Sequence, residues 1–189
     1  GDSIRMGMQE QVALALGADF QVLGPEENCS DTATHLANLD KWVVDPRPDI
    51  VQINAGLHDL KLHDATGQHQ VPIEQYRQNL TRVLARLREL APNARLIWAT
   101  STPVIEDKHN AAKPDFNRYN ADIDRYNAAA RQIAADAGFE INDLHAVVIA
   151  AGVKTCICDD GVHMTDFGNQ ALATAVAKSG PVALSAWSS

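Results

Sequence analysis

The middle of the chain determines the architecture, because it contains DIVQIN (49–54), PIEQYRQNLTRVLARLREL (72–90) and ARLIWAT (94–100) in succession. The first and last segments are short apolar runs, a pattern typical of buried strands. The central segment has Pro72 in its first turn and apolar residues every three or four positions, which predicts an amphipathic helix. Its inward residues are expected to be Ile73, Tyr76, Leu80, Val83, Leu84 and Leu87. A strand, a helix and a strand in succession predict neighbouring parallel strands.

The same alternation continues in both directions along the chain. Helices are predicted over 5–16, Thr32–Val44, Pro114–Ala137, 143–151 and 166–178, and strands over Asp19–Leu23 and Phe139–Asn142. The inner stripe of the helix over 114–137 is expected to be Phe116, Tyr119, Ile123, Tyr126, Ala130 and Ile133. The pattern predicts a parallel sheet with helices on both faces. We expect one domain over 1–180 and a C-terminal tail over 181–189.

A Gly-Asp-Ser turn that opens a helix is expected to follow a strand, and nothing precedes Gly1. The sequence therefore predicts that a first strand, central to the sheet, is missing and leaves an open slot. Residues 181–187 (PVALSAW) are apolar enough to fill it, although a disordered tail is the other expectation.

Composition excludes some classes of function. The chain has 189 residues and a formal net charge of −8, which argues against binding nucleic acid or anionic membranes. That charge fits a neutral or cationic small substrate, or a neutral polysaccharide. No apolar run approaches the ~20 residues of a membrane span. Cys29, Cys156 and Cys158 lack the spacing of a zinc site, so free thiols are favoured, with a bridge from Cys29 to one of the others left open.

Two short segments at the ends of the chain carry the chemistry. In Gly1-Asp2-Ser3-Ile4, glycine permits a tight turn and Ser3 presents its hydroxyl at a helix N-terminus, although an ordinary capping turn has the same form. In Asp160-Gly161-Val162-His163, one turn brings Asp160 onto the Nδ1–H of the imidazole and leaves the other ring nitrogen free to act as a base. A lone loop histidine is more often a surface residue, but this spacing favours a catalytic pair.

Two further loops follow predicted strands, where ligands bind in parallel sheets. They are Asn54–Asp59 (NAGLHD) and Glu26–Thr32 (EENCSDT). As structural features, the first is a turn with Asp59 capping a short helix, and the second is a helix start capped by Ser30 or Asp31. As functional features, they supply hydrogen-bond donors.

Together the four segments resemble the SGNH (GDSL-like) hydrolases, in the same order and over essentially the whole chain. The resemblance implies a flavodoxin-like three-layer α/β/α sandwich with a parallel sheet. It also implies that Ser3 is the nucleophile, His163 the base and Asp160 its partner. No metal or organic cofactor is implied.

The chain departs from the family pattern at two positions. It has His58 in Gly56-Leu57-His58-Asp59, where the family usually has Asn, and Ser30 in a loop that usually has Gly. A backbone donor survives a change from Gly to Ser if φ is allowed, and a neutral imidazole donates one hydrogen bond. The resemblance therefore implies an oxyanion hole of the Ser3 and Ser30 N–H groups and a side chain, either His58 or Asn54. The changes resemble a subfamily trait.

The implied function is a serine esterase. Aromatic residues are 5% of the chain and no long apolar insertion offers a lid or tunnel, so a short acyl group on a polar alcohol is expected. The family resemblance favours a carbohydrate O-acetylesterase with a small-molecule or carbohydrate ester as substrate, in a secreted or periplasmic location. The remaining histidines are expected to be solvated or structural: His35, His63, His69, His109 and His145.

Other interpretations stay open. A lysophospholipase or thioesterase would need a deep apolar groove. A non-catalytic carbohydrate-binding or partner-binding domain would fit the changes at Ser30 and His58. An acyltransferase would use the same triad with a sugar hydroxyl in place of water. The oligomeric state and the exact substrate are not predicted.

Overall fold

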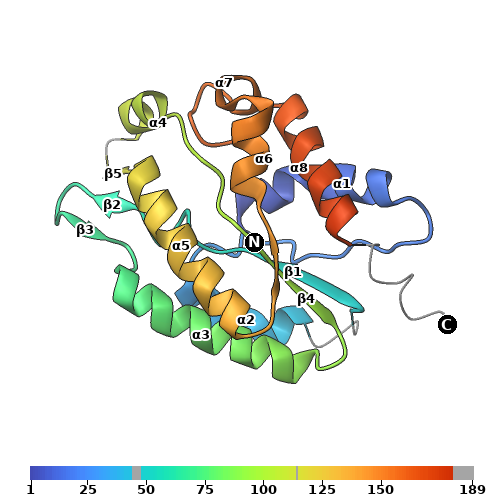
Figure 1. Ribbon diagram of the computed structural model, residues 1–189. Helices are drawn as coiled ribbons and strands as arrows, with labels where there is room; N and C mark the ends of the chain where they lie inside the picture. Colours follow the sequence, from blue (N-terminus) through green and yellow to red (C-terminus); the bar gives the residue numbers. More distant parts are fainter. Residues whose placement is uncertain (44–47, 114, 181–189) are drawn as a thin grey trace.

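The computed structural model describes residues 1–43, 48–113 and 115–180 (Figure 1). In this part of the chain the helices are α1 (Ser3–Leu16), α2 (Thr32–Val43), α3 (Ile73–Leu90), α4 (Glu106–Ala112), α5 (Asn120–Asp136), α6 (Leu144–Ala151), α7 (Val153–Cys156) and α8 (Asp166–Ser179). The strands are β1 (Ile50–Ile53), β2 (Leu62–His63), β3 (Gln68–His69), β4 (Arg95–Ala99), β5 (Phe116–Asn117) and β6 (Glu140–Asn142).

The main sheet has the order β1-β4-β6, and both pairs of neighbours are parallel. Ile50 lies opposite Arg95 at one end of the β1–β4 pair, and Ile53 lies opposite Trp98 at the other. Parallel strands end at one common edge, so the loops after Ile53 and Ala99 meet there. This arrangement confirms the predicted parallel α/β architecture.

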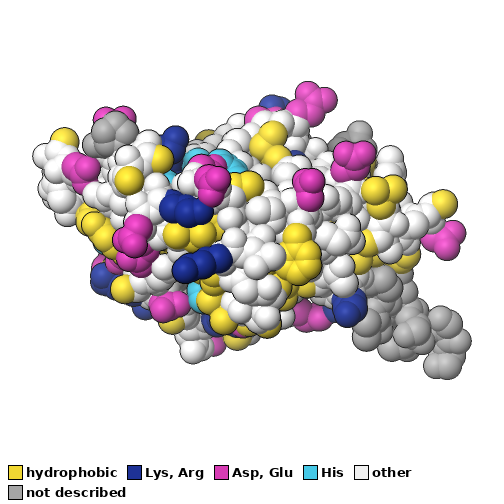
Figure 2. All heavy atoms as spheres, turned by 90° about the horizontal axis from the view of Figure 1, so that it is seen from above, with side chains coloured by type: hydrophobic (Ala, Val, Ile, Leu, Met, Phe, Trp, Pro, Cys, Tyr) yellow, Lys and Arg dark blue, Asp and Glu magenta, His cyan; other side chains and the backbone are white. Residues whose placement is uncertain are grey.

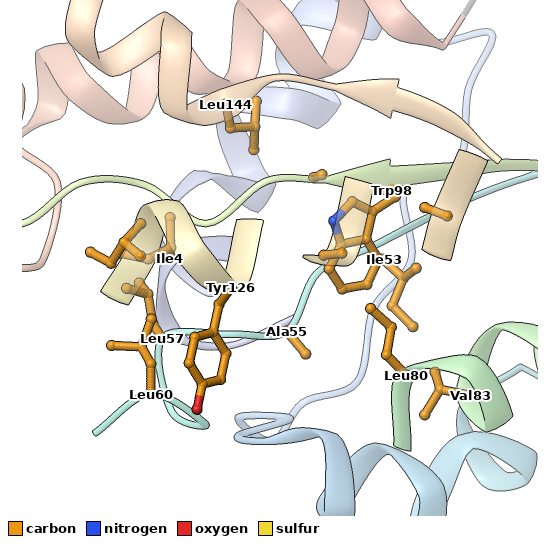
Figure 3. Packing of buried hydrophobic residues seen from close by; sticks show 14 of the residues in the cluster. Ile4, Ile53, Ala55, Leu57, Leu60, Leu80, Val83, Trp98, Tyr126 and Leu144 are labelled. Carbon is orange, nitrogen blue, oxygen red and sulfur yellow. The ribbon is translucent and has the colours of Figure 1, made fainter. Parts of the chain in front are cut away.

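Helices cover both faces of this sheet. The helices α1, α6 and α8 pack together on one side, and α2, α3 and α5 pack together on the other (Figure 1). Trp98 of β4 is fully buried and lies beside Ile53 of β1, facing Leu80 and Val83 of α3 (Figure 3). The predicted inward residues of α3 are all buried, since its apolar stripe faces this core. With helices on both faces of the sheet, the loops that follow the strands are gathered at its carboxyl edge.

A small antiparallel sheet of order β3-β2-β5 lies outside the main one. It corrects the predicted helix over Pro114–Ala137, because Phe116 and Asn117 pair with β2 and α5 begins only at Asn120. Pro114 lies outside the described residues. Ile123, Tyr126 and Ala130 are buried as expected, whereas Phe116 and Tyr119 precede the helix.

The predicted strand over Asp19–Leu23 is wrong, because no ladder forms there. Leu23 and Gly24 face β1 across a hollow of about 510 Å³, so this segment has no strand beside it among the described residues. Val44 of the predicted second helix and the tail over 181–189, including the apolar 181–187, lie outside the described residues.

All three cysteines, Cys29, Cys156 and Cys158, are free, so the bridge left open from Cys29 is absent. Within the described ranges, we find no helix with the length and apolar character needed to cross a membrane.

Candidate active site

Ser3 is the first residue of α1. Asp2 caps this helix, since its carboxylate accepts a hydrogen bond of 3.0 Å from the N–H of Ile4. As the first helical residue, Ser3 has no helical acceptor for its own N–H. Gly1 borders the same small pocket as Asn54 and Ser101, which follow β1 and β4. The Ser3 hydroxyl therefore lies at the carboxyl edge of the sheet.

Ser3, His163 and Asp160 form a continuous hydrogen-bonded chain. Ser3 Oγ lies 2.9 Å from His163 Nε2, and His163 Nδ1 lies 2.5 Å from Asp160 Oδ2. The second carboxylate oxygen of Asp160 accepts the N–H groups of Val162 and His163, each at 2.9 Å. A tight turn of only four residues thus holds the Asp160 carboxylate against the His163 imidazole.

The electrostatics of this turn keep Asp160 ionised. Burial raises its pKa, but the hydrogen bonds from His163 and Val162 outweigh burial and lower the pKa of the carboxyl to about 2. The His163 side chain is 52% exposed and that of Asp160 is 43% exposed. An ionised carboxylate on Nδ1 stabilises an imidazolium, and the exposed ring leaves the site open to water.

Gly161 determines how this loop lies against the protein. Its φ is +76°, and a Cβ there would meet the backbone N of His109 at 2.5 Å and the backbone O of Ile105 at 2.7 Å. Its carbonyl accepts a hydrogen bond of 2.9 Å from Ile105. The loop from Asp160 to His163 is therefore packed tightly on the start of α4, a helix that the sequence did not predict.

The loop before α2 carries Ser30 in an unusual conformation. Its φ is +53°, in the left-handed region that favours glycine. Its N–H donates to Asn28 Oδ1 at 2.9 Å, and its hydroxyl lies 3.2 Å from His58 Nδ1. Asp31, one of the two predicted caps, is the residue that caps α2, because it accepts the N–H of Thr34.

His58 is half-buried and neutral at ordinary pH. Burial is the main cause, and nearby Lys61 adds to it, so that the pKa of His58 falls to about 4. Its Nε2 has no partner among the described residues and is not enclosed. Asn54, the other predicted donor, gives its amide to Ala99 O at 2.8 Å. The structure thus leaves Nε2 of His58 without a partner among the described residues and engages the Asn54 amide with the sheet.

The buried carboxylate of Asp59 connects two loops at this edge. It does not cap a short helix; its Oδ1 accepts the N–H of Thr32 at 2.9 Å and the Thr32 hydroxyl at 2.5 Å. Asn79 donates to the same hydroxyl. Burial raises the pKa of Asp59 to about 7, against the effect of the hydrogen bonds from Thr32. This buried contact joins the two loops that carry Ser30 and His58.

Sequence reasoning missed Arg118 and Asn28, which also lie at this edge. The Arg118 guanidinium is buried and donates to the carbonyl of Leu57, next to His58. No motif surrounds Arg118, whereas Asn28 lies in the predicted loop Glu26–Thr32 but was assigned no role there. In the described ranges, no group of at least three His, Cys, Asp or Glu side chains is placed to hold a metal ion.

Comparison with known proteins places this chain in a family. A model of the GDSL-like Lipase/Acylhydrolase family matches residues 1–171. The chain is 28% identical over 130 residues to the isoamyl acetate-hydrolyzing esterase 1 homolog of Homo sapiens, covering 66% of this chain and 52% of that protein. It is 27% identical over 120 residues to the N-acetylneuraminate (7)9-O-acetyltransferase of Danio rerio, covering 64% of this chain and 15% of that protein. The chain thus spans about half the length of the esterase homologue.

A solved structure supports the fold. The acetyl xylan esterase AlAXEase matches with a TM-score of 0.72 at 19% identity, covering 95% of this chain and 90% of that chain. The likeness confirms the predicted SGNH hydrolase fold.

Proposed function

Because this chain belongs to the GDSL-like lipase/acylhydrolase family, we propose that it is a serine esterase with Ser3, His163 and Asp160 as its catalytic triad. One observation carries the proposal, namely the continuous chain from Ser3 Oγ to His163 Nε2 (2.9 Å) and from His163 Nδ1 to Asp160 Oδ2 (2.5 Å). A nucleophile, a base and an orienting carboxylate in this order are what acyl transfer to serine needs.

In the first half of the reaction, Ser3 Oγ attacks the ester carbonyl while His163 Nε2 takes its proton. The ester C–O bond then breaks, and the imidazolium returns the proton to the departing alcohol. In the second half, water attacks the acyl-enzyme with His163 again as base, which releases the acid and restores Ser3. Asp160 holds the tautomer and stabilises the imidazolium throughout.

The oxyanion of each tetrahedral intermediate is held by the free N–H of Ser3 and by His58. We infer that the Ser30 hydroxyl, 3.2 Å from Nδ1 of the neutral ring, donates to that nitrogen, which places the proton of His58 on Nε2 and makes it available as a donor. The Ser30 N–H joins them when Asn28 Oδ1 releases it. Asn54 is the weakest candidate, because its amide is already engaged by Ala99 O.

The substrate we propose is a short acyl ester, an acetyl group on a carbohydrate. The exposed side chains of His163 and Asp160 leave the triad open to solvent, which suits a small acyl group on a bulky polar alcohol. The names of the matched proteins, which include an acetyl xylan esterase and an isoamyl acetate-hydrolyzing esterase homologue, support the same class. An exposed histidine also favours water over a sugar hydroxyl as the acyl acceptor.

The test is hydrolysis of para-nitrophenyl acetate and butyrate by the chain and by its Ser3→Ala variant. We expect turnover of acetate above butyrate, and a loss of at least about a thousandfold in kcat in the variant. Circular dichroism of both proteins controls for folding. Equal background rates from two folded proteins would refute the esterase and favour a binding domain on the same fold.

A further inference from the structure

We propose that Lys61 and Arg118, here called the cationic pair, bind a negatively charged group on the ester substrate beside His58. The inference rests on the proposed function and adds a substrate class to it. It concerns two side chains that the catalytic steps above do not use.

The cationic pair is assembled on one aromatic ring. Lys61 Nζ lies 4.9 Å from the centre of the Phe116 ring, and Arg118 Cζ lies 5.1 Å from it. Phe116 is held in place because β5 pairs with β2, opposite His63. Contact with the face of a ring stabilises a cation without neutralising it, so both positive charges remain available.

Arg118 lies between the two loops of the active site. Its Nε donates to Leu57 O at 2.7 Å, next to His58, and its Nη1 lies 3.2 Å from Nε2 of His109. His109 is the residue on which Gly161, in the loop from Asp160 to His163, packs. The guanidinium therefore contacts one loop directly and the other through one side chain. Its Nη2 has no partner among the described residues and is not enclosed.

Neither cation has an acidic partner in the described part of the chain. No carboxylate there lies within 4.0 Å of Lys61 or Arg118, whereas other cations are paired in this way. The paired cations are Lys41, Arg86, Arg95, Lys108 and Arg131. Arg118 is only 5% exposed, and burial lowers its pKa to about 10. Asp2 and Asp160 stabilise the Arg118 charge through space but do not contact it, so an anion that bonds directly to the guanidinium would lower the cost of its burial further.

The chemistry of the two groups indicates the ligand. A guanidinium with a free nitrogen suits a planar oxyanion such as a carboxylate, and a half-buried ammonium adds a point charge. The net charge of −8 favours neutral or cationic ligands for the molecule as a whole. Acidic and basic side chains intermingle on the face drawn in Figure 2. The expected substrate is an ester that carries a carboxylate on its alcohol or acyl part.

Matched substrates test the proposal. For the alcohol side, kcat/KM is measured for para-acetoxybenzoate and its neutral counterpart para-acetoxybenzamide. For the acyl side, mono-para-nitrophenyl succinate is compared with para-nitrophenyl butyrate. We expect Lys61→Gln to lower the ratio of the anionic to the neutral substrate by about fivefold to tenfold in one of the two pairs. The pair that responds identifies the part of the ester that carries the charge.

Lys178→Gln is the control, because it removes the same charge from the far end of α8 and is expected to leave both ratios unchanged. Unchanged ratios in Lys61→Gln, with neutral esters still hydrolysed, would overturn the cationic pair and leave the esterase intact. If no ester is hydrolysed at all, the esterase fails, and calorimetric titration with benzoate decides the binding site alone. Binding that is lost in Lys61→Gln would support the site, and no binding to the parent chain would overturn it.

Discussion

At the scale of single residues, Ser30 combines backbone strain with a specific contact. A φ of +53° is unfavourable for a residue with a Cβ, by about 1 kcal/mol, yet its hydroxyl lies 3.2 Å from His58 Nδ1. Glycine would remove the strain and the hydroxyl together. The structure therefore predicts that a change from Ser30 to glycine raises stability and lowers activity.

We expect Ser30→Gly and Ser30→Ala to lower kcat for para-nitrophenyl acetate by a similar factor of about five to ten, because both remove the hydroxyl that directs the His58 proton to Nε2. Ser30→Gly should nevertheless be the more stable variant by about 1 kcal/mol in urea unfolding. Nitrogen NMR of the His58 ring reads the tautomer directly. A loss of activity in the alanine variant alone, with the tautomer unchanged, would show that the hydroxyl has no such role.

Asp59 is a second residue of interest, because its ionisation makes the stability of the protein depend on pH. Its pKa is raised to about 7 by burial, whereas an unfolded aspartate titrates near about 3.9. Between these values the folded chain keeps a proton that the unfolded chain has released. Stability from this group is therefore present at low pH and falls as pH rises, until it levels off above about 7.

We predict that Asp59→Asn flattens this dependence, because the amide keeps an oxygen for Thr32 and has no proton to lose. The free energy of unfolding, measured in urea from pH 4.5 to 8, should fall in the parent by roughly 3 kcal/mol more than in the variant. Asp19→Asn, at an exposed position, is the control. Parallel curves for parent and Asp59→Asn would mean that the carboxyl is ionised throughout.

At the scale of elements, periodicity succeeded where a segment packs by its own pattern. The helix predicted over 72–90 is α3 to within one residue, because its apolar stripe alone determines what it buries. The predictions over 19–23 and 115–119 failed for the opposite reason. A strand forms only where it can pair with another strand, and periodicity along one segment does not show where that partner lies. Phe116 belongs to a helical sequence pattern, but it pairs with β2.

The contacts of the site were likewise predicted only in part. The end motifs predicted the contacts of Ser3, His163 and Asp160, because the short loop from Asp160 to His163 determines most of that geometry. Arg118 and the capture of the Ser30 N–H by Asn28 were beyond reach. The contacts of Arg118 depend on which loops meet in space, whereas the Asn28 contact is a local Asx turn that the loop sequence permits but does not require.

The loop from Asp160 to His163 depends on a glycine, and this gives a prediction for the element. Gly161→Ala would force a Cβ to within 2.5 Å of the His109 backbone at a φ of +76°. We expect a loss of about 2–3 kcal/mol in stability and of about tenfold to a hundredfold in kcat, since the loop must move and His163 with it.

Gly67→Ala is the matched control for that variant. Gly67 has a φ of +63°, but nothing lies within 4 Å of the added Cβ. Its substitution should cost about 1 kcal/mol of stability through strain alone and leave kcat unchanged. Equal effects of the two variants on kcat would show that positive φ, and not contact with α4, governs the activity.

At the scale of the whole molecule, the carboxyl edge of the main sheet holds the proposed site, and the amino edge holds contacts that stabilise the fold. The carboxyl edge carries the triad and the loops around it. At the amino edge, Arg95 begins β4 and joins three segments, with its Nε 2.5 Å from Glu140 of β6 and its Nη1 2.5 Å from Ser179 O and 2.7 Å from Gly180 O. Its side chain is only 19% exposed, so these bonds are partly shielded from water.

This separation predicts that Arg95→Ala affects stability without affecting chemistry. Removing hydrogen bonds between a charged group and partly buried acceptors should lower the free energy of unfolding by about 2–3 kcal/mol, and Tm by about 5–10 °C. The kcat for para-nitrophenyl acetate, measured well below Tm, should stay within about twofold of the parent because no part of the triad rests on that edge. Arg77→Ala, at an exposed position on α3, should change neither quantity. A fall in kcat with Tm unchanged would mean that the amino edge is coupled to the triad through the sheet, and that the division of work between the two ends does not hold.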